Sequence, residues 1–267
     1  MEKNENNTIL SVKNLSIKYP GTKDAVRNVS FQLEEGDFLL VVGENGTGKS
    51  TLIKGILGLV KPYCGEICYP YGETDKKTGY LPQQSDIPKD FPATVTEVVL
   101  SGFAGKKGIF SFYTKRDRKK ATDIISYLGL EKLSKKHFSA LSGGERQRVL
   151  LARALVSATD CGVCCDKKCN CHDETFCHTS GLIVLDEPSN GLDPITNKNL
   201  YTTLDSLRRE KGMTVMMVSH LVDSAMEYAT KVLHMGGDML FFGSKEDYLK
   251  SELSKSLCGL FGRKDNE

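Results

Sequence analysis

The sequence lacks an excess of charge of one sign. Lysine and arginine together number 36 and aspartate and glutamate number 34, so the formal net charge is only +2. A protein that grips a nucleic acid or another polyanion usually presents a strong positive field over one face. The balanced composition therefore gives no support to a nucleic-acid groove, and charge alone does not identify a partner.

The sequence also lacks a hydrophobic run long enough to cross a membrane. Residues 1–7 are polar and contain no apolar signal-peptide core. The apolar run that ends at Val42 is far shorter than the roughly 20 residues that a membrane-spanning helix needs. We therefore expect a cytoplasmic protein, and any role at a membrane requires another polypeptide.

No internal repeat is present, and hydrophobic periodicity divides the 267 residues into strands and helices. Alternating apolar and polar residues predict antiparallel strands within 9–33. Short apolar runs predict buried strands at 38–42, 182–185 and 213–218, and helical spacing predicts helices at 51–59, 95–102, 117–130, 142–156 and 196–210. This alternation predicts a doubly wound α/β core, and the helical stretch at about 84–140 is interpreted as an insertion into it.

A glycine-rich turn follows the predicted strand at 38–42. Residues 43–50 match the phosphate-loop pattern G-x-x-x-x-G-K-[ST] and lie between a strand and a helix, as that pattern requires. The glycines allow backbone N–H groups to surround phosphates, and the helix N-terminus favours negative charge. Lys49 is expected to pair with the β- and γ-phosphates, and Ser50 is expected to bind Mg²⁺. A chance glycine-rich turn is the alternative, and it would not require these flanking elements.

Two carboxylates follow the predicted strand at 182–185. Asp186 and Glu187 stand at its carboxyl end, which is where α/β sheets bind ligands. Such a pair alone is often only a solvated strand end. In a chain that also carries a phosphate loop, we expect Asp186 to hold Mg²⁺, directly or through water, and Glu187 to orient and polarise the attacking water.

Residues 141–148, Leu-Ser-Gly-Gly-Glu-Arg-Gln-Arg, decide the family. By physical criteria Ser142 is a helix N-cap with Glu145 three residues later, which predicts a capping box, and Gly143 and Gly144 leave N–H groups open to an anion. An ordinary helix start is the alternative. The string resembles, almost letter for letter, the signature motif of ABC-transporter ATPases, and the resemblance extends from about residue 9 to residue 242.

The resemblance implies an α/β fold of the P-loop NTPase class, with a RecA-like core, an antiparallel β subdomain and a helical subdomain. It places the ABC ATPase domain at 8–246, with the helical subdomain at about 84–140, a Cys-rich insertion at about 158–180 and a C-terminal tail at 247–267.

Further landmarks of the family appear in the expected order. Tyr19 resembles the aromatic residue that stacks on adenine, and Gln83 resembles the glutamine that reaches Mg²⁺ and the attacking water, with Gln84 as the neighbouring candidate. Asp193 resembles the residue of the loop that bridges two protomers, and His220 resembles the histidine that contacts the γ-phosphate. Generic side chains in loops and at strand ends are the alternatives.

The resemblance thus implies one complete set of site residues for ATP and Mg²⁺. Gln83, Glu187 and His220 are the expected catalytic residues, and Ser50, Gln83 and Asp186 are the expected Mg²⁺ ligands. The residues expected to bind the nucleotide are Tyr19, Gly43, Asn45, Gly46, Gly48, Lys49, Ser50, Thr51, Asp186, Ser142, Gly143, Gly144, Glu145 and Asp193.

The resemblance also implies partners. Two copies are expected to pair head to tail as a homodimer, so that each ATP lies between the phosphate loop of one protomer and the signature motif of the other. Pairing with a similar subunit is the alternative. Transmembrane permease subunits, and through them a solute-binding protein, are the further expected partners, with the chain peripheral on the inner face of the cell membrane and no nucleic acid bound. The stretch 90–102 is similar to subunits of zinc, manganese and iron importers, which favours import of a divalent metal ion.

The sequence departs from the family between 156 and 181, where a connection of about five residues is expected. Six of the nine cysteines and two histidines lie in this insertion, which is more than the four ligands that a tetrahedral Zn²⁺ ion needs. The candidate Zn²⁺ ligands are Cys161, Cys164, Cys165, Cys169, Cys171, His172, Cys177 and His178. A disordered Cys-rich loop and redox-active thiols are the alternatives.

Two other readings of the whole chain compete with a transport ATPase. A soluble ABC ATPase acting on nucleic acid usually has two nucleotide domains or long coiled-coil arms, and this chain shows neither. A metal-storage module with an inert nucleotide fold would not need Lys49, Glu187 and His220. The remaining cysteines, Cys64, Cys68 and Cys258, are interpreted as structural.

Overall fold

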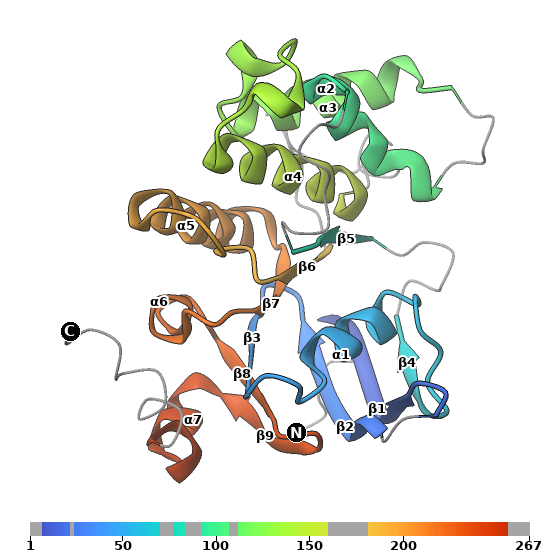
Figure 1. The fold of residues 1–267 in the computed structure, drawn as a ribbon, viewed down its shortest axis with the longest axis vertical. Coiled ribbons are helices and arrows are strands. Elements are labelled where there is room, and N and C mark those ends of the chain that lie inside the picture. The colour runs from blue at the N-terminus through green and yellow to red at the C-terminus, as the bar shows by residue number, and fades with distance from the viewer. Residues whose placement is uncertain are drawn as a thin grey trace. The chain divides into compact units, whose positions relative to one another are not determined.

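The computed structural model describes residues 7–21, 24–69, 77–83, 92–106, 112–159 and 181–255. The chain divides into two compact units, which we call unit 1 (Met1–Thr74 and Met216–Glu267) and unit 2 (Asp75–Val215). Figure 1 shows the elements of both units along the chain. The strand β7 (Thr214–Val218), whose five residues are all buried, carries the boundary between them.

Unit 1 contains a three-stranded antiparallel sheet. Strand β1 (Thr8–Lys18) lies between β2 (Asp24–Glu34) and β4 (Cys64–Cys68). Shifts in the β1–β2 register surround Asn14, which adopts a φ of 48°, a conformation that asparagine tolerates better than most residues. The antiparallel strands predicted within 9–33 are therefore confirmed.

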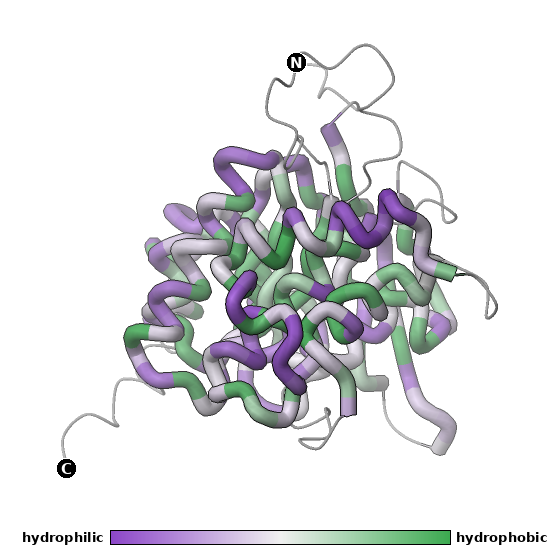
Figure 2. The backbone as a smooth tube through the Cα atoms, turned by 90° about the horizontal axis from the view of Figure 1, so that it is seen from above, coloured by the Kyte–Doolittle hydropathy of each residue, from purple (hydrophilic) through white to green (hydrophobic). Residues whose placement is uncertain are grey.

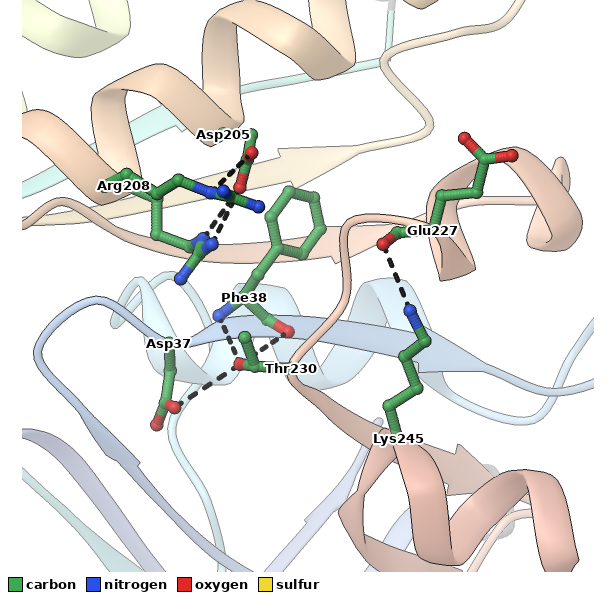
Figure 3. Close-up of polar contacts among 8 residues, drawn as sticks. Asp37, Phe38, Asp205, Arg208, Glu227, Thr230 and Lys245 are labelled. Carbon is green, nitrogen blue, oxygen red and sulfur yellow. Dashed lines mark hydrogen bonds and ion pairs between the residues drawn. The ribbon is translucent and has the colours of Figure 1, made fainter.

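Unit 1 also holds the strand that leads to the phosphate loop. Strand β3 (Phe38–Val42) is completely buried and pairs in parallel with β8 (Lys231–Met235), which pairs antiparallel with β9 (Met239–Ser244). The start of β3 is fixed by Thr230, whose hydroxyl accepts a hydrogen bond from the Phe38 N–H at 2.9 Å (Figure 3). The Asp37 carboxylate also forms an ion pair with Lys231 at 2.7 Å.

Among its described residues, unit 1 also contains the short helices α1 (Lys49–Ile56), α6 (Val222–Met226) and α7 (Lys245–Lys250), and residues 252–255 are helical as well. The ammonium group of Lys245 donates to the main-chain oxygen of Glu227 at 3.1 Å, just beyond the end of α6, which ties the first residue of α7 to the preceding helix (Figure 3).

Unit 2 combines two parallel strands with helices. Strands β5 (Thr78–Leu81) and β6 (Leu182–Asp186) pair in parallel from Thr78 opposite Leu182 to Leu81 opposite Leu185. The α-helices are α2 (Val95–Leu100), α3 (Lys115–Tyr127), α4 (Gly143–Ala158) and α5 (Pro194–Lys211), and 3-10 helices lie at Ser101–Lys106, Glu131–Leu133 and Phe138–Ala140. The mixed α/β class of the fold is confirmed.

Helix α5 shows how local sequence sets the helix ends. Asp193 caps its first turn, Pro194 occupies the first helical position, and Gly212 ends it with a φ of 69°. Near its end Asp205 accepts from Arg208 at 2.8 Å (Figure 3). Figure 2 shows polar and apolar residues alternating along the helices. In the described part of the chain, no helix is both long and apolar enough to cross a membrane.

The helix and strand predictions differ from the structure mainly at their ends. The helix predicted at 51–59 runs from Lys49 to Ile56. It ends earlier than predicted because Gly58 adopts a left-handed conformation, with a φ of 73°. The strands β8 and β9 and the helices α6 and α7 were not predicted from the sequence. Helix α7 begins before the proposed tail at 247–267, and its Tyr248 is only 1% exposed. Cys64 and Cys68 are exposed free thiols, so burial does not support their structural interpretation.

A histidine lies in the core of unit 1 beside helix α7. The Nδ1 atom of His234 is 3.0 Å from the Tyr248 hydroxyl, and His234 is 7% exposed. Burial lowers the pKa of His234 below its usual range, and the charge of Lys49 acts in the same direction against the opposing charge of Glu44. The folded state therefore favours the neutral imidazole.

This depressed pKa predicts that acid destabilises unit 1 through His234. Stability from the neutral ring is fully present above the unfolded pKa of about 6.5 and is lost as the pH falls toward and below the folded value. In the variant His234→Gln, the unfolding free energy measured by urea denaturation should decrease less between pH 7.5 and pH 5 than it does in the wild type. The control Tyr248→Phe keeps the titrating ring, so it should lose about 1 kcal/mol at pH 7.5 yet retain a pH dependence. An identical slope in the wild type and His234→Gln would contradict this.

Candidate functional site

The glycine-rich turn of unit 1 can be formed only by glycine at its two narrowest points. Gly43 follows β3 with a φ of 141°, and a Cβ atom there would collide with the main-chain oxygen of Met235. Gly48 has a φ of 91°, and a Cβ atom there would collide with the main-chain oxygen of Ala25. The loop is therefore pressed against two neighbouring segments of unit 1, which fixes its path.

Lys49 lies inside this loop rather than in solvent. Its ammonium group donates to the main-chain oxygens of Gly43 at 2.8 Å and Glu44 at 2.7 Å, and the residue is only 7% exposed. Gly48 is the N-cap of α1 and supplies no side-chain hydrogen bond to the first turn, which contains no acidic residue. The first N–H groups of α1 and a buried cation thus lie on one loop, as an anion site requires.

The parallel pairing of β5 with β6 brings two predicted catalytic residues together in unit 2. Leu81 lies opposite Leu185, so Gln83 and Glu187, each two residues further on, leave the same edge of the sheet. The Gln83 amide Nε2 donates to the Glu187 carboxylate at 3.1 Å. Asp186, the last residue of β6 and the neighbour of Glu187 in the chain, is buried, with only 6% of its surface exposed.

Glu187 has an unusual backbone conformation. Its φ is 50°, which costs a residue with a side chain about 1–2 kcal/mol. The strain is balanced by local hydrogen bonds, because the Asn190 amide Nδ2 donates to the Glu187 carboxylate at 3.2 Å and the Asn190 N–H donates to the Glu187 main-chain oxygen at 3.2 Å. One carboxylate oxygen of Glu187 thus accepts from two side-chain amides, and its direction is set by both.

The signature residues form the predicted helix start. The Ser142 hydroxyl accepts from the Glu145 N–H at 3.3 Å, and the Ser142 N–H donates to the Glu145 carboxylate at 2.8 Å, so the capping box is confirmed. The Ser142 N–H and hydroxyl hold the pKa of Glu145 below its usual range. Gly144 packs against α5, because a Cβ atom there would lie 2.7 Å from the Thr196 side chain.

A groove of about 880 Å³ in unit 2 joins the signature residues to Asp193. Its walls include Ser142, Gly143 and Gly144 from the start of α4 and Asp193 from the start of α5. The Asp193 carboxylate accepts from the Thr196 hydroxyl at 2.6 Å, and this bond, with the Thr196 and Ile195 N–H groups, lowers the pKa of Asp193. Two helix N-termini, each already capped by its own side chain, therefore open on one groove.

Two further predicted residues belong to unit 1. Tyr19 follows β1 and His220 follows β7, both half-buried in unit 1. Gln84 and all candidate Zn²⁺ ligands between Cys161 and His178 lie outside the described residues. In the described part of the chain, no three His, Cys, Asp or Glu side chains are grouped to hold a metal ion.

Comparison with known families identifies the family of the chain. The family model described as ABC transporter matches residues 26–164, which is more than half of the chain. The chain belongs to the ATP-binding subunits of ABC transporters. This family consists of ATPases that bind ATP with Mg²⁺, so the predicted family and enzyme class are confirmed.

Individual relatives are transport proteins of bacteria. The chain is 34% identical to the manganese transport system ATP-binding protein MntB of Bacillus subtilis, over 94% of this chain and 92% of that protein. It is 33% identical to the zinc uptake system ATP-binding protein ZurA of Listeria innocua, over 91% of this chain and 88% of that protein. Neither relative favours the nucleic-acid alternative.

Solved structures give the same family. A nucleotide-free ATP-binding cassette of an ABC transporter is 25% identical, with a TM-score of 0.72 over 92% of this chain and 95% of that one. The dimeric structure of a bacterial ABC transporter cassette is also 25% identical, with a TM-score of 0.67 over 89% of this chain and 99% of that one.

Two residues that contact Glu187 or its neighbour Pro188 were not predicted from the sequence of this ABC ATPase. Asn190 could have been suspected, because it lies three positions after Glu187, across the turn that follows β6. Gln147 carried a clearer signal, since it occupies the first position of the buried stripe of α4, which continues through Leu150, Leu151 and Ala154. A polar residue on an apolar stripe needs a buried partner, and the sequence did not say which.

The collision at Gly48 predicts an asymmetry between two loop glycines. Gly48→Ala should destabilise the nucleotide-free protein by more than about 2 kcal/mol, because the new methyl group meets the Ala25 main-chain oxygen. The matched control Gly46→Ala, at a φ of 83° with nothing within 4 Å, should cost only about 1 kcal/mol. Urea denaturation measures both, and equal losses would show that the close approach is relaxed in solution.

Proposed function

We propose that this chain hydrolyses MgATP to drive an ABC importer of a divalent metal ion. The observation that carries the proposal is the Glu187 carboxylate, held by the Gln83 and Asn190 amides immediately after the buried Asp186. A carboxylate with a fixed direction beside a buried second carboxylate suits a base that orients water at a metal-bound phosphate.

Nucleotide binding rests on the phosphate loop. Gly43 and Gly48 let the loop lie against the main chain of Met235 and Ala25, where a side chain would collide, and Lys49 already lies within the loop. We assign Lys49 to the β- and γ-phosphates, and the Ser50 hydroxyl and Asp186 carboxylate to Mg²⁺, since oxygen donors are what this ion prefers. When bound, Mg²⁺ neutralises charge on the transferred phosphoryl group. Tyr19 is assigned to the adenine ring by family resemblance.

Catalytic roles are assigned to Glu187, Gln83 and His220. Glu187 accepts a proton from, or orients, the attacking water, and Gln83 donates to Glu187 and is assigned as a further Mg²⁺ ligand. His220 is assigned to the γ-phosphate by family resemblance, as a donor that stabilises the charge developing there.

We assign the other side of each ATP site to a second copy of the chain. The start of α4 and Asp193 line one groove, and their N–H-rich helix ends suit a partner's triphosphate. A dimeric cassette among the solved relatives supports this assembly. Glu145 is assigned to hold the signature turn through its contacts with Ser142.

The cargo and the membrane partner are inferred from relatives. Two of the relatives that this chain resembles are named for zinc uptake and for manganese transport. We infer that permease subunits bind the chain at the inner face of the cell membrane and that a solute-binding protein delivers the metal ion to them. Residues 92–102, which include α2, belong to the importer-like stretch that favours this cargo.

Glu187→Gln is the sharpest test of the hydrolytic site. The amide keeps the shape and loses the base, so kcat should fall by at least about 100-fold while the Kd for ATP stays within threefold. Light scattering with ATP and Mg²⁺ should show the variant trapped as a dimer. In cells, the same variant should abolish uptake of zinc or manganese measured by elemental analysis.

The control Glu252→Gln makes the same chemical change at a carboxylate whose side chain is 86% exposed, and it should leave ATPase activity unchanged. If Glu187→Gln turns over ATP at the wild-type rate, Glu187 is not the base. Normal metal uptake with Glu187→Gln would reject the metal cargo.

We also propose that the insertion at about 158–180 binds Zn²⁺ or another thiophilic metal. Six cysteines and two histidines with C-x-x-C spacing in 18 residues, Cys161 to His178, support this assignment. The insertion precedes β6, whose other end carries Asp186, so a structural or sensing role suits it better than catalysis.

The double variant Cys164→Ser, Cys169→Ser should lose stoichiometric metal by elemental analysis and keep basal ATPase activity close to that of the wild type. Cys64→Ser, Cys68→Ser is the matched control, at two exposed thiols on β4, and should retain the metal. Unchanged metal content in the first variant would reject the site.

A further inference from the structure

Gln147 connects the signature helix to the residue that follows Glu187. It lies five residues after Ser142 on α4 and is only 1% exposed. Its amide Nε2 donates to the main-chain oxygen of Pro188 at 2.7 Å, in a buried position. A buried hydrogen bond of this length is strong and is not shared with water.

The segment that receives this hydrogen bond is the one whose backbone is strained. Glu187 has a φ of 50°, and the peptide group of Pro188 is the next along the chain. On its other side, the Ser189 hydroxyl lies 3.2 Å from the buried Tyr201 hydroxyl of α5. The loop is thus held from α4 and from α5, while its carboxylate is held by Gln83 and Asn190.

The segment of α4 between its start at Gly143 and Gln147 is short enough to move as a rigid body. Gly143 and Gln147 are one turn apart, and the capping box makes the first turn rigid. A displacement of the Ser142 end of α4 therefore displaces the Gln147 amide by a similar amount. Because the amide is bonded to Pro188, the Glu187 backbone is pulled in the same direction.

We propose that Gln147 is a positioning residue, which transmits engagement of the signature motif to the catalytic Glu187 of the same protomer. The proposal rests on the proposed function, since it gives Glu187 its part in hydrolysis. In a head-to-tail dimer, the signature motif and Glu187 of one protomer serve different nucleotides. Gln147 thereby couples occupancy of one site to hydrolysis at the other.

Two variants test the proposal. Gln147→Met keeps the length and volume of the side chain and removes the donor, so kcat should fall about tenfold, with the KM and Kd for ATP within twofold and a lower Hill coefficient. Gln147→Glu puts a carboxylate against the Pro188 oxygen, and protonation restores a donor. The ratio of its kcat to that of the wild type should therefore rise as the pH is lowered.

The matched control is Gln32→Met, the same change at an exposed glutamine of β2, which should keep wild-type kinetics. A merely structural Gln147 would lower the melting temperature and leave kcat per ATP-binding site unchanged in both variants. That outcome overturns the proposal, as does failure of both variants to fold. If the wild type itself does not hydrolyse ATP, the proposed function fails instead, which separates the two conclusions.

Discussion

The parallel pairing of β5 with β6 is the constraint on which the catalytic part of unit 2 depends. It sets Leu81 opposite Leu185, and this register places Gln83 and Glu187 within hydrogen-bond distance although they are far apart in the sequence. A shift of one residue would turn the side chains of β6 to the other face and separate the two groups. Burial of all five residues of β6 opposes such a shift.

The loop after β6 combines strain with several independent supports. A non-glycine residue at a φ of 50° is unfavourable by itself, and a strained residue persists only where its surroundings determine it. Asn190 satisfies the Glu187 carboxylate and main-chain oxygen, and Gln147 satisfies the next carbonyl group. This arrangement suits a base, because the Glu187 carboxylate is already oriented before the reaction and loses little conformational freedom during it.

In unit 1, the phosphate loop is held in place mainly by contacts with main-chain atoms. The phosphate loop must present N–H groups and one cation, so it cannot fill its interior with side chains. Contacts of Gly43 and Gly48 with neighbouring main chain hold the loop from outside, and Lys49 bonds to its carbonyl groups from inside. The loop therefore has a defined path that does not depend on side-chain packing.

The sequence by itself determined the motifs and the local elements. The capping box at Ser142, the buried strands at 38–42 and 182–185 and the glycine-rich turn depend on neighbours in the chain, so periodicity and spacing predict them. Strands β8 and β9 were missed because nothing local distinguishes them, and pairing with β3 and with each other stabilises them.

Only the tertiary structure decided what surrounds Glu187. The Gln147 side chain is 41 positions from Pro188, and Gln83 is 104 positions from Glu187, so no local pattern relates them. Gln147 is a polar residue on the buried stripe of α4, and such a residue needs a buried hydrogen-bond partner. Which partner it has depends on how α4 packs in unit 2, a property of the folded chain and not of any segment.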